Sequence, residues 1–134
     1  MTERGVYKNA NRGRQLIRFD GIKYGNITPT DGDVMIEYKN QLWVFGEVKM
    51  VGVEVPYGQR LALERLVVDT GKAGKHSIAI IGDHNIRDIM QDVYLAKDVM
   101  AREFFSTETN LWRPPKRKMS FTQVMDAYIS FFEV

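Results

Sequence analysis

The sequence predicts an α/β fold in which helices flank a central mixed β-sheet. Two runs rich in β-branched and aromatic residues, "DVMIEY" and "LWVFGEVK", indicate neighbouring strands. A helix-like segment follows, and then the continuous apolar run "SIAIIG", which is typical of a strand buried on both faces. With one more candidate strand before these runs and a helix at the end of the chain, the order strand, strand, strand, helix, strand indicates a sheet covered by helices.

The first three strands are expected in the N-terminal part of the chain. Residues 1–13 are polar and punctuated by glycine, and Gln15–Phe19 is the candidate first strand, closed by the turn signal Asp20-Gly21. The next two strands are expected at 33–38 and 42–49, with the polar residues 39–41 between them. This pair is predicted to form a hairpin at the centre of the sheet.

The segment Tyr57–Gly71 predicts a helix, with Gly71 at the C′ position where the helix ends. Its apolar face is formed by Leu63, Leu66 and Val67. The buried strand Ser77–Gly82 follows.

Beyond Gly82 the pattern allows a helix, but alternating apolar residues favour a strand from about Val93 to Phe105. Ser120 with Gln123 three residues later forms a capping box, which predicts the start of a C-terminal helix. That helix is expected to pack through one apolar stripe, formed by Phe121, Val124, Met125, Tyr128 and Phe132.

Composition limits the kind of site that the protein can hold. The chain has 134 residues, which suits a single domain over residues 1–134. It contains no cysteine and only two histidines, so any metal ion would be held mainly by oxygen atoms. No apolar run resembles a signal peptide or a membrane span, and we therefore expect a soluble, cytoplasmic protein without a membrane partner.

The predicted hairpin carries charge where a central sheet is normally apolar. If residues 39–41 form a three-residue loop, Tyr38 pairs with Leu42 and Asp33 lies opposite Glu47. In that register Lys49 shares the face of the two acids, because side chains alternate along a strand. The other face is then wholly apolar, formed by Val34, Ile36, Tyr38, Leu42, Val44 and Val48.

Two carboxylates opposed across a sheet repel each other, and a divalent cation removes that conflict. Mg²⁺ suits such a pair because it binds one or two carboxylates together with water and phosphate oxygens. The ammonium group of Lys49 would reach the same place and stabilise charge on a phosphate.

The succession "TDGDVMIEY", a turn, "LWVFGEVK" and "GQRLALERL" resembles the core of the PD-(D/E)XK nuclease superfamily, over roughly residues 27–82. The most similar members are the small virus-type replication-repair nucleases and the archaeal-type Holliday junction resolvases. The resemblance implies a restriction-endonuclease-like core, with Asp33, Glu47 and the carbonyl group of Val48 as metal ligands. It further implies that Lys49 and Gln59 are catalytic, with Mg²⁺ as the cofactor and Mn²⁺ as a substitute.

Two positions depart from the family pattern. The proline that usually precedes the aspartate is not adjacent here, so Asp31 remains the alternative ligand to Asp33. The acid that many members supply from a first helix has only Glu3 as a counterpart, and a frayed terminus is the other interpretation of that residue.

Basic residues gather at both ends of the chain and would suit DNA phosphates, although a solvated surface is the simpler interpretation. Those that we consider for nucleic-acid binding are Arg12, Arg14, Arg60, Arg113, Lys116, Arg117 and Lys118. The sequence thus predicts a metal-dependent, structure-specific DNA endonuclease for junctions or branched DNA, acting in repair or recombination. It is expected to work as a homodimer or with a targeting protein. The alternative is a non-catalytic DNA-binding or assembly protein with the same fold.

Overall fold

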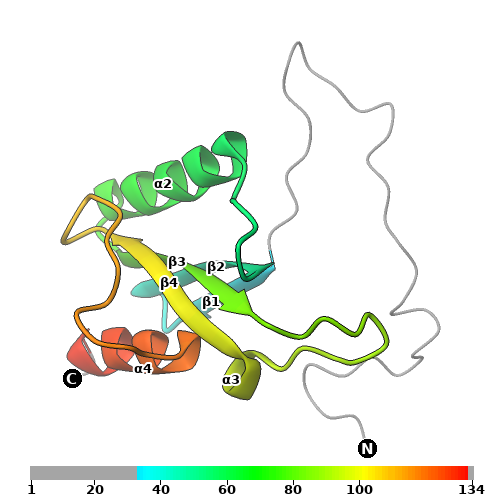
Figure 1. Ribbon diagram of the computed structural model, residues 1–134. Helices are drawn as coiled ribbons and strands as arrows, with labels where there is room; N and C mark the ends of the chain where they lie inside the picture. Colours follow the sequence, from blue (N-terminus) through cyan, green and yellow to red (C-terminus); the bar gives the residue numbers. More distant parts are fainter. Residues whose placement is uncertain (1–32, 133–134) are drawn as a thin grey trace, which may run out of the picture. The chain divides into compact units, whose positions relative to one another are not determined.

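The computed structural model describes residues 33–132, which form a four-stranded sheet with helices on both faces (Figure 1). The strands are β1 (Val34–Tyr38), β2 (Leu42–Met50), β3 (His76–His84) and β4 (Val99–Ser106), and the helices are α2 (Tyr57–Lys72), α3 (Leu95–Asp98) and α4 (Phe121–Phe132). The strands follow one another across the sheet, and only β2 and β3 run parallel. The prediction of an α/β fold with a mixed central sheet is confirmed. The strand expected at Gln15–Phe19 lies outside the described residues, and so does the N-terminal part of the predicted single domain.

The hairpin of β1 and β2 has the predicted register. Tyr38 pairs with Leu42, and the pairing continues to Val34 with Gly46. Lys39 and Asn40 both have positive φ angles, of 51° and 57°, which is the backbone geometry of a tight hairpin turn. The six residues predicted for the apolar face all belong to one core cluster, together with Phe121 and Val124 of α4. The face of the hairpin that the pattern assigned to packing is therefore the face under α4.

Helix α4 packs so closely on the sheet that two strand glycines are needed beneath it. A Cβ atom on Gly46 would lie 2.5 Å from Cζ of Phe121, and one on Gly82 would lie 2.9 Å from its Cδ2. Phe121 is fully buried as a result. The predicted capping box begins the helix: the Ser120 N–H donates to Gln123 Oε1 at 2.8 Å, and the Gln123 N–H donates to Ser120 Oγ at 3.1 Å.

Helix α2 covers the opposite face of the sheet (Figure 1) and ends differently from the prediction. Gly71 lies inside the last turn, where an added Cβ would lie 2.8 Å from Thr107 Cγ2, so this glycine allows close packing. The C′ residue is Gly74, with a φ of 87°. Its N–H donates to the Gly71 carbonyl and the next N–H, of Lys75, donates to the Thr70 carbonyl, which is a Schellman motif. The predicted C′ position at Gly71 was wrong.

The strand predicted from about Val93 is shorter than expected. Residues 95–98 form the single turn α3, and β4 begins only at Val99. The turn is closed in both directions, since the Asp98 N–H donates to the Tyr94 carbonyl and the Tyr94 N–H donates to Asp98 Oδ2, each at 2.8 Å. The alternation before Val99 was therefore misleading, because local hydrogen bonds of Asp98 override it.

The buried strand predicted at Ser77–Gly82 is confirmed as the centre of β3, and all six of its residues are buried. On the face of the sheet that α2 covers, Leu63 and Val67 of the helix pack with Ala79 and Ile81 of β3. Leu66 of α2 is exposed. None of the helices within residues 33–132 is both long enough and apolar enough to cross a membrane.

Candidate active site

Two acids predicted as metal ligands lie together at the end of the hairpin away from its turn. Glu47 is on β2 and is only 5% exposed. Asp33 immediately precedes β1, and continuing the register by one residue places it opposite Glu47. The Val48 N–H donates to Asp33 Oδ2 at 2.8 Å, so the carboxylate of Asp33 is turned back onto β2.

Burial of Glu47 raises the pKa of its carboxyl group from 4.5 to about 7. The negative charge of Asp33 also raises this pKa, while Lys49 lowers it. Lys49 Nζ lies 3.5 Å from Glu47 Oε1. The structure thus brings together the predicted set of two acids and one lysine, and it gives one of the acids a proton near neutral pH.

The donor set fits a hard divalent cation. A proton held by Glu47 relieves the repulsion between the two carboxylates, and a cation would do the same more completely. Within residues 33–132 no group of three or more His, Cys, Asp or Glu side chains could hold a metal ion. An ion bound by Asp33 and Glu47 would therefore take its other ligands from a carbonyl group such as that of Val48, from water or from substrate. Asp31 and Glu3, the other acids considered, lie outside the described residues.

Gln59, predicted to be catalytic, lies in the first turn of α2. Its Oε1 atom is buried and has no hydrogen-bond partner among the residues that the structure describes. A buried amide oxygen without a partner costs stability, and groups of this kind in folded proteins call for an explanation. A ligand or an ion near the start of α2 would supply the missing partner.

Arg60, which the sequence offered as a phosphate contact, is tied to other side chains of the protein. Its guanidinium forms an ion pair with Glu103 of β4 and lies 4.7 Å from the ring centre of Trp112. Trp112 Nε1 in turn donates to Glu64 Oε1 at 2.7 Å. Trp112 is half-buried, and through this bond it anchors its loop on α2.

Asp83 and Arg102 form a second charged pair beside Lys49, and the sequence reasoning missed them. Asp83 pairs with Lys49 in the sheet register. Arg102 is the extra residue of a bulge in β4, and its Nε and Nη2 atoms donate to Asp83 Oδ1 at 2.8 and 2.5 Å. Because Arg102 compensates Asp83, Lys49 keeps Glu47 as its acidic partner. A charged residue directly after the buried strand was a signal for Asp83, whereas no pattern reveals the bulge.

His84, at the end of β3, lines a cavity of about 360 Å³ together with Asp33, Val34 and Val48. The Ile86 N–H donates to His84 Nδ1 at 3.1 Å, so in the neutral ring Nε2 carries the proton. His84 therefore lies at the same end of the sheet as Asp33.

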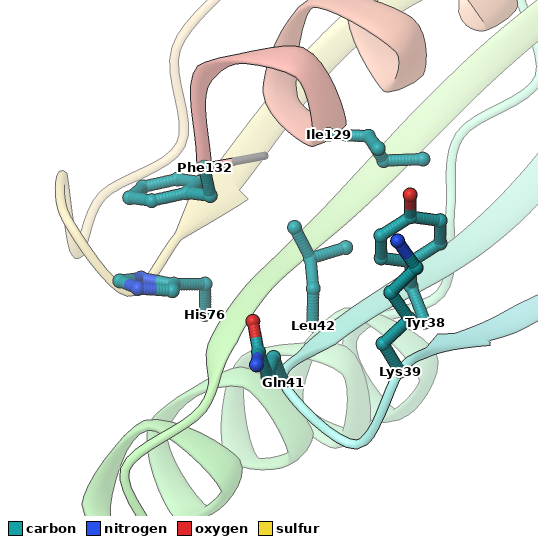
Figure 2. A pocket seen from close by; sticks show the side chains of 7 residues that line it. All are labelled: Tyr38, Lys39, Gln41, Leu42, His76, Ile129 and Phe132. Atoms are coloured by element: carbon teal, nitrogen blue, oxygen red, sulfur yellow. The ribbon is translucent and has the colours of Figure 1, made fainter. Parts of the chain in front are cut away.

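A second cavity lies at the opposite end of the sheet, beside the hairpin turn. Its volume is about 190 Å³, and Figure 2 shows its lining side chains, with the His76 ring lying beside Phe132. The two ring centres are 3.7 Å apart. Glu108 connects His76 to Tyr128, accepting from the tyrosine hydroxyl at 2.6 Å. The described residues that line this cavity include no acid, so it does not resemble the Asp33 and Glu47 site.

The predicted basic cluster lies on the loop between β4 and α4. The side chains of Arg113, Lys116, Arg117 and Lys118 are all exposed. In the part of the chain that the structure describes, none of the four takes part in an ion pair. Arg12 and Arg14 lie outside that part.

Comparisons with protein-family models, with curated proteins and with solved structures found no match to this chain.

Proposed function

We propose that this protein is a metal-dependent DNA nuclease with a restriction-endonuclease-like core. The observation that carries the proposal is the arrangement at the end of the β1 and β2 hairpin. There a buried acid, Glu47, meets Asp33 on one side and lies 3.5 Å from the ammonium group of Lys49 on the other. The proposal is supported further by the order of the elements, with α2 directly after the strand that carries Glu47 and Lys49.

Each side chain has a distinct part in this proposal. Asp33 and Glu47 would hold the cation, and Gln59 would use its unpaired buried oxygen toward the bound water or substrate. A divalent ion, Mg²⁺ or Mn²⁺, supplies Lewis acidity toward a phosphate oxygen and toward a water molecule. Lys49 places a positive charge where negative charge develops on the phosphate during hydrolysis.

The substrate class in this proposal is DNA with a junction or a branch. The site is built on one small sheet, and the part of the chain that the structure describes adds no separate domain for recognising a sequence. A homodimer would place two such sites on two strands of one junction. A structure-specific enzyme therefore suits this architecture better than one that reads a long sequence.

The test is cleavage of linear duplex, single-stranded and four-way-junction DNA in Mg²⁺ or Mn²⁺. Asp33→Asn, Glu47→Gln and Lys49→Met should each lower the cleavage rate by at least about 100-fold. Glu37→Gln and Lys72→Met are the matched controls, since these exposed residues lie on β1 and at the end of α2, and they should stay within about twofold of wild type.

Calorimetry with Mn²⁺ separates the nuclease from a non-catalytic protein of the same fold. Wild-type protein should bind the ion, and Asp33→Asn or Glu47→Gln should weaken binding at least about tenfold. Folded variants that cut DNA as well as wild type would show that the site is misassigned. A wild-type protein that binds DNA, but neither binds Mn²⁺ nor cuts, would favour the non-catalytic alternative.

A further inference from the structure

An apolar groove runs between α4 and the loop that precedes it, on the side of the sheet opposite Glu47. Its volume is about 560 Å³, which is enough for one or two large side chains. Ile78 and Phe104 form its floor, and Val124, Ala127 and Phe131 of α4 form one wall. Phe131 is 80% exposed, which is unusual for a phenylalanine with an apolar cavity beside it.

Two prolines lie in the loop beside the groove, and Pro115 lines it. The loop is bridged to the edge strand β4 at Arg113 with Phe104 and again at Ser120 with Met100. Between these bridges Pro114 and Pro115 have no N–H group, so the ladder cannot continue. The loop therefore arches away from the sheet and leaves the groove beneath it, held open at both ends.

The rim of the groove is positively charged. Lys116 and Arg117 line it, and Arg113 and Lys118 lie beside them on the same arch. Among the described residues that line the groove, none is acidic. Among residues 33–132 no acid pairs with these four cations, so their charge is available to a partner.

Phosphates alone would use only the rim. A nucleic-acid backbone is fully charged, so its phosphates would make no apolar contact with Phe131 and Ala127 in the groove. A peptide that carries a large apolar side chain next to acidic residues uses both features, because its apolar group fills the groove and its carboxylates meet the cations.

We propose that this groove docks a short acidic segment of a partner protein through an aromatic or branched aliphatic anchor. The site is distinct from the Asp33 and Glu47 pair, and the proposal does not depend on the nuclease activity. Docking of this kind would bring the protein to its place of action without occupying the active edge of the sheet.

The experiment is selection of a phage-displayed library of random 12-residue peptides on the full-length protein, followed by affinity measurement on synthetic peptides. Enriched peptides should carry an aromatic, leucine or isoleucine residue within two positions of at least two acids. Their affinity should fall at least about tenfold in Phe131→Ser and in the double variant Lys116→Glu with Arg117→Glu.

Matched controls distinguish peptide binding in the groove from nonspecific apolar contact and from an effect of net charge. Ile89→Ser removes another exposed apolar residue, which is 94% exposed and lies on the loop between β3 and α3. The double variant Lys72→Glu with Arg87→Glu makes the same change in charge elsewhere on exposed positions. Both should bind the selected peptides within about twofold of wild type.

Three outcomes would overturn the proposal. One is a library that yields no enriched acidic and apolar pattern. Another is a peptide whose affinity is the same in the groove variants and in the controls. The third is a different occupant of the groove, either DNA or a second copy of the chain. DNA binding that depends on Lys116 and Arg117 but is unaffected by Phe131→Ser would assign the loop to nucleic acid. A dimer in sedimentation that Phe131→Ser dissociates would assign the groove to a second copy of the chain.

Discussion

The two faces of the β1 and β2 hairpin are built under opposite constraints, and adjacent residues of β2 show this directly. Gly46 lies under α4, where even a Cβ atom would collide with Phe121. Glu47, the next residue, lies on the other face and is also buried, but its neighbours are Asp33 and Lys49. The first position is limited by space and the second by charge.

This difference indicates which face is free to do chemistry. On the α4 face Val44 and Gly46 are held in close packing with the core cluster that contains Phe121, so a polar group at either position would cost stability. On the α2 face the apolar packing of Phe45 and Ile81 ends where the charges begin. Buried charges at that boundary are costly for folding, which is the usual sign that they serve a function.

The largest effect is expected on the packed face. Phe121→Ala should lower the free energy of unfolding by about 4 kcal/mol, because it removes a fully buried ring between two strand glycines. Urea denaturation measures this. Phe131→Ala is the matched control on the same helix, and its ring is 80% exposed, so a loss above about 0.5 kcal/mol there would contradict the comparison.

The next effect concerns charge. The pKa of Glu47 in the folded protein, about 7, lies above its ordinary value of 4.5, so the folded chain binds more protons between these values. The stability that neutral Glu47 provides is therefore complete below pH 4.5 and is lost as the pH rises through 7. The loss is on the order of 3 kcal/mol.

Urea denaturation in EDTA, from pH 4 to pH 8.5, tests this with Glu47→Gln as the comparison. As the pH rises, the free energy of unfolding of wild type should fall relative to that of Glu47→Gln. Parallel pH profiles for the two proteins would show that Glu47 is not held in the protonated form.

A smaller loss is expected when the packed face is made too full. Gly46→Ala should cost about 2 kcal/mol, since its methyl group would lie 2.5 Å from Phe121 Cζ. Gly58→Ala, in the first turn of α2, has no atom within 4 Å of the added Cβ and should be neutral or slightly stabilising. Equal urea midpoints for the two variants would mean that α4 can move away from the sheet at no cost.

The smallest effect tests how α4 is held at its start. Ser120→Ala should cost about 1 kcal/mol, because it removes the hydroxyl that accepts from the Gln123 N–H. Ser130→Ala, at an exposed position of the same helix, should change stability by less than about 0.5 kcal/mol. Thermal unfolding of the two variants would decide this, and equal melting temperatures would leave the capping box without an energetic role.

Local patterns predicted the fold where the chain's own periodicity is strong. The buried run around Ile80 and the capping box at Ser120 were both identified correctly, because burial and capping are encoded by neighbouring residues. The end of α2 and the start of β4 were misplaced. In the first case Gly71 serves contact with Thr107, and in the second case Asp98 closes a local turn that the alternation of apolar residues hides.

The candidate site was predicted in part for the same reason. The alternation of charged and apolar residues places Glu47 and Lys49 on one face, and the turn length sets their register with Asp33. The use of Arg60 in an ion pair with Glu103 could not be predicted, because β4 reaches that position only through the order of strands in the sheet.

By itself the sequence determined the hairpin register, since a shift by one residue would have exchanged its apolar and charged faces. Only the tertiary structure decided which helix covers which face and how deeply Glu47 is buried. It also decided that a groove lies between α4 and the loop that contains the two prolines. The physical reason is that alternation along a strand is a property of the local backbone, whereas burial, charge compensation and grooves arise between segments far apart in the chain.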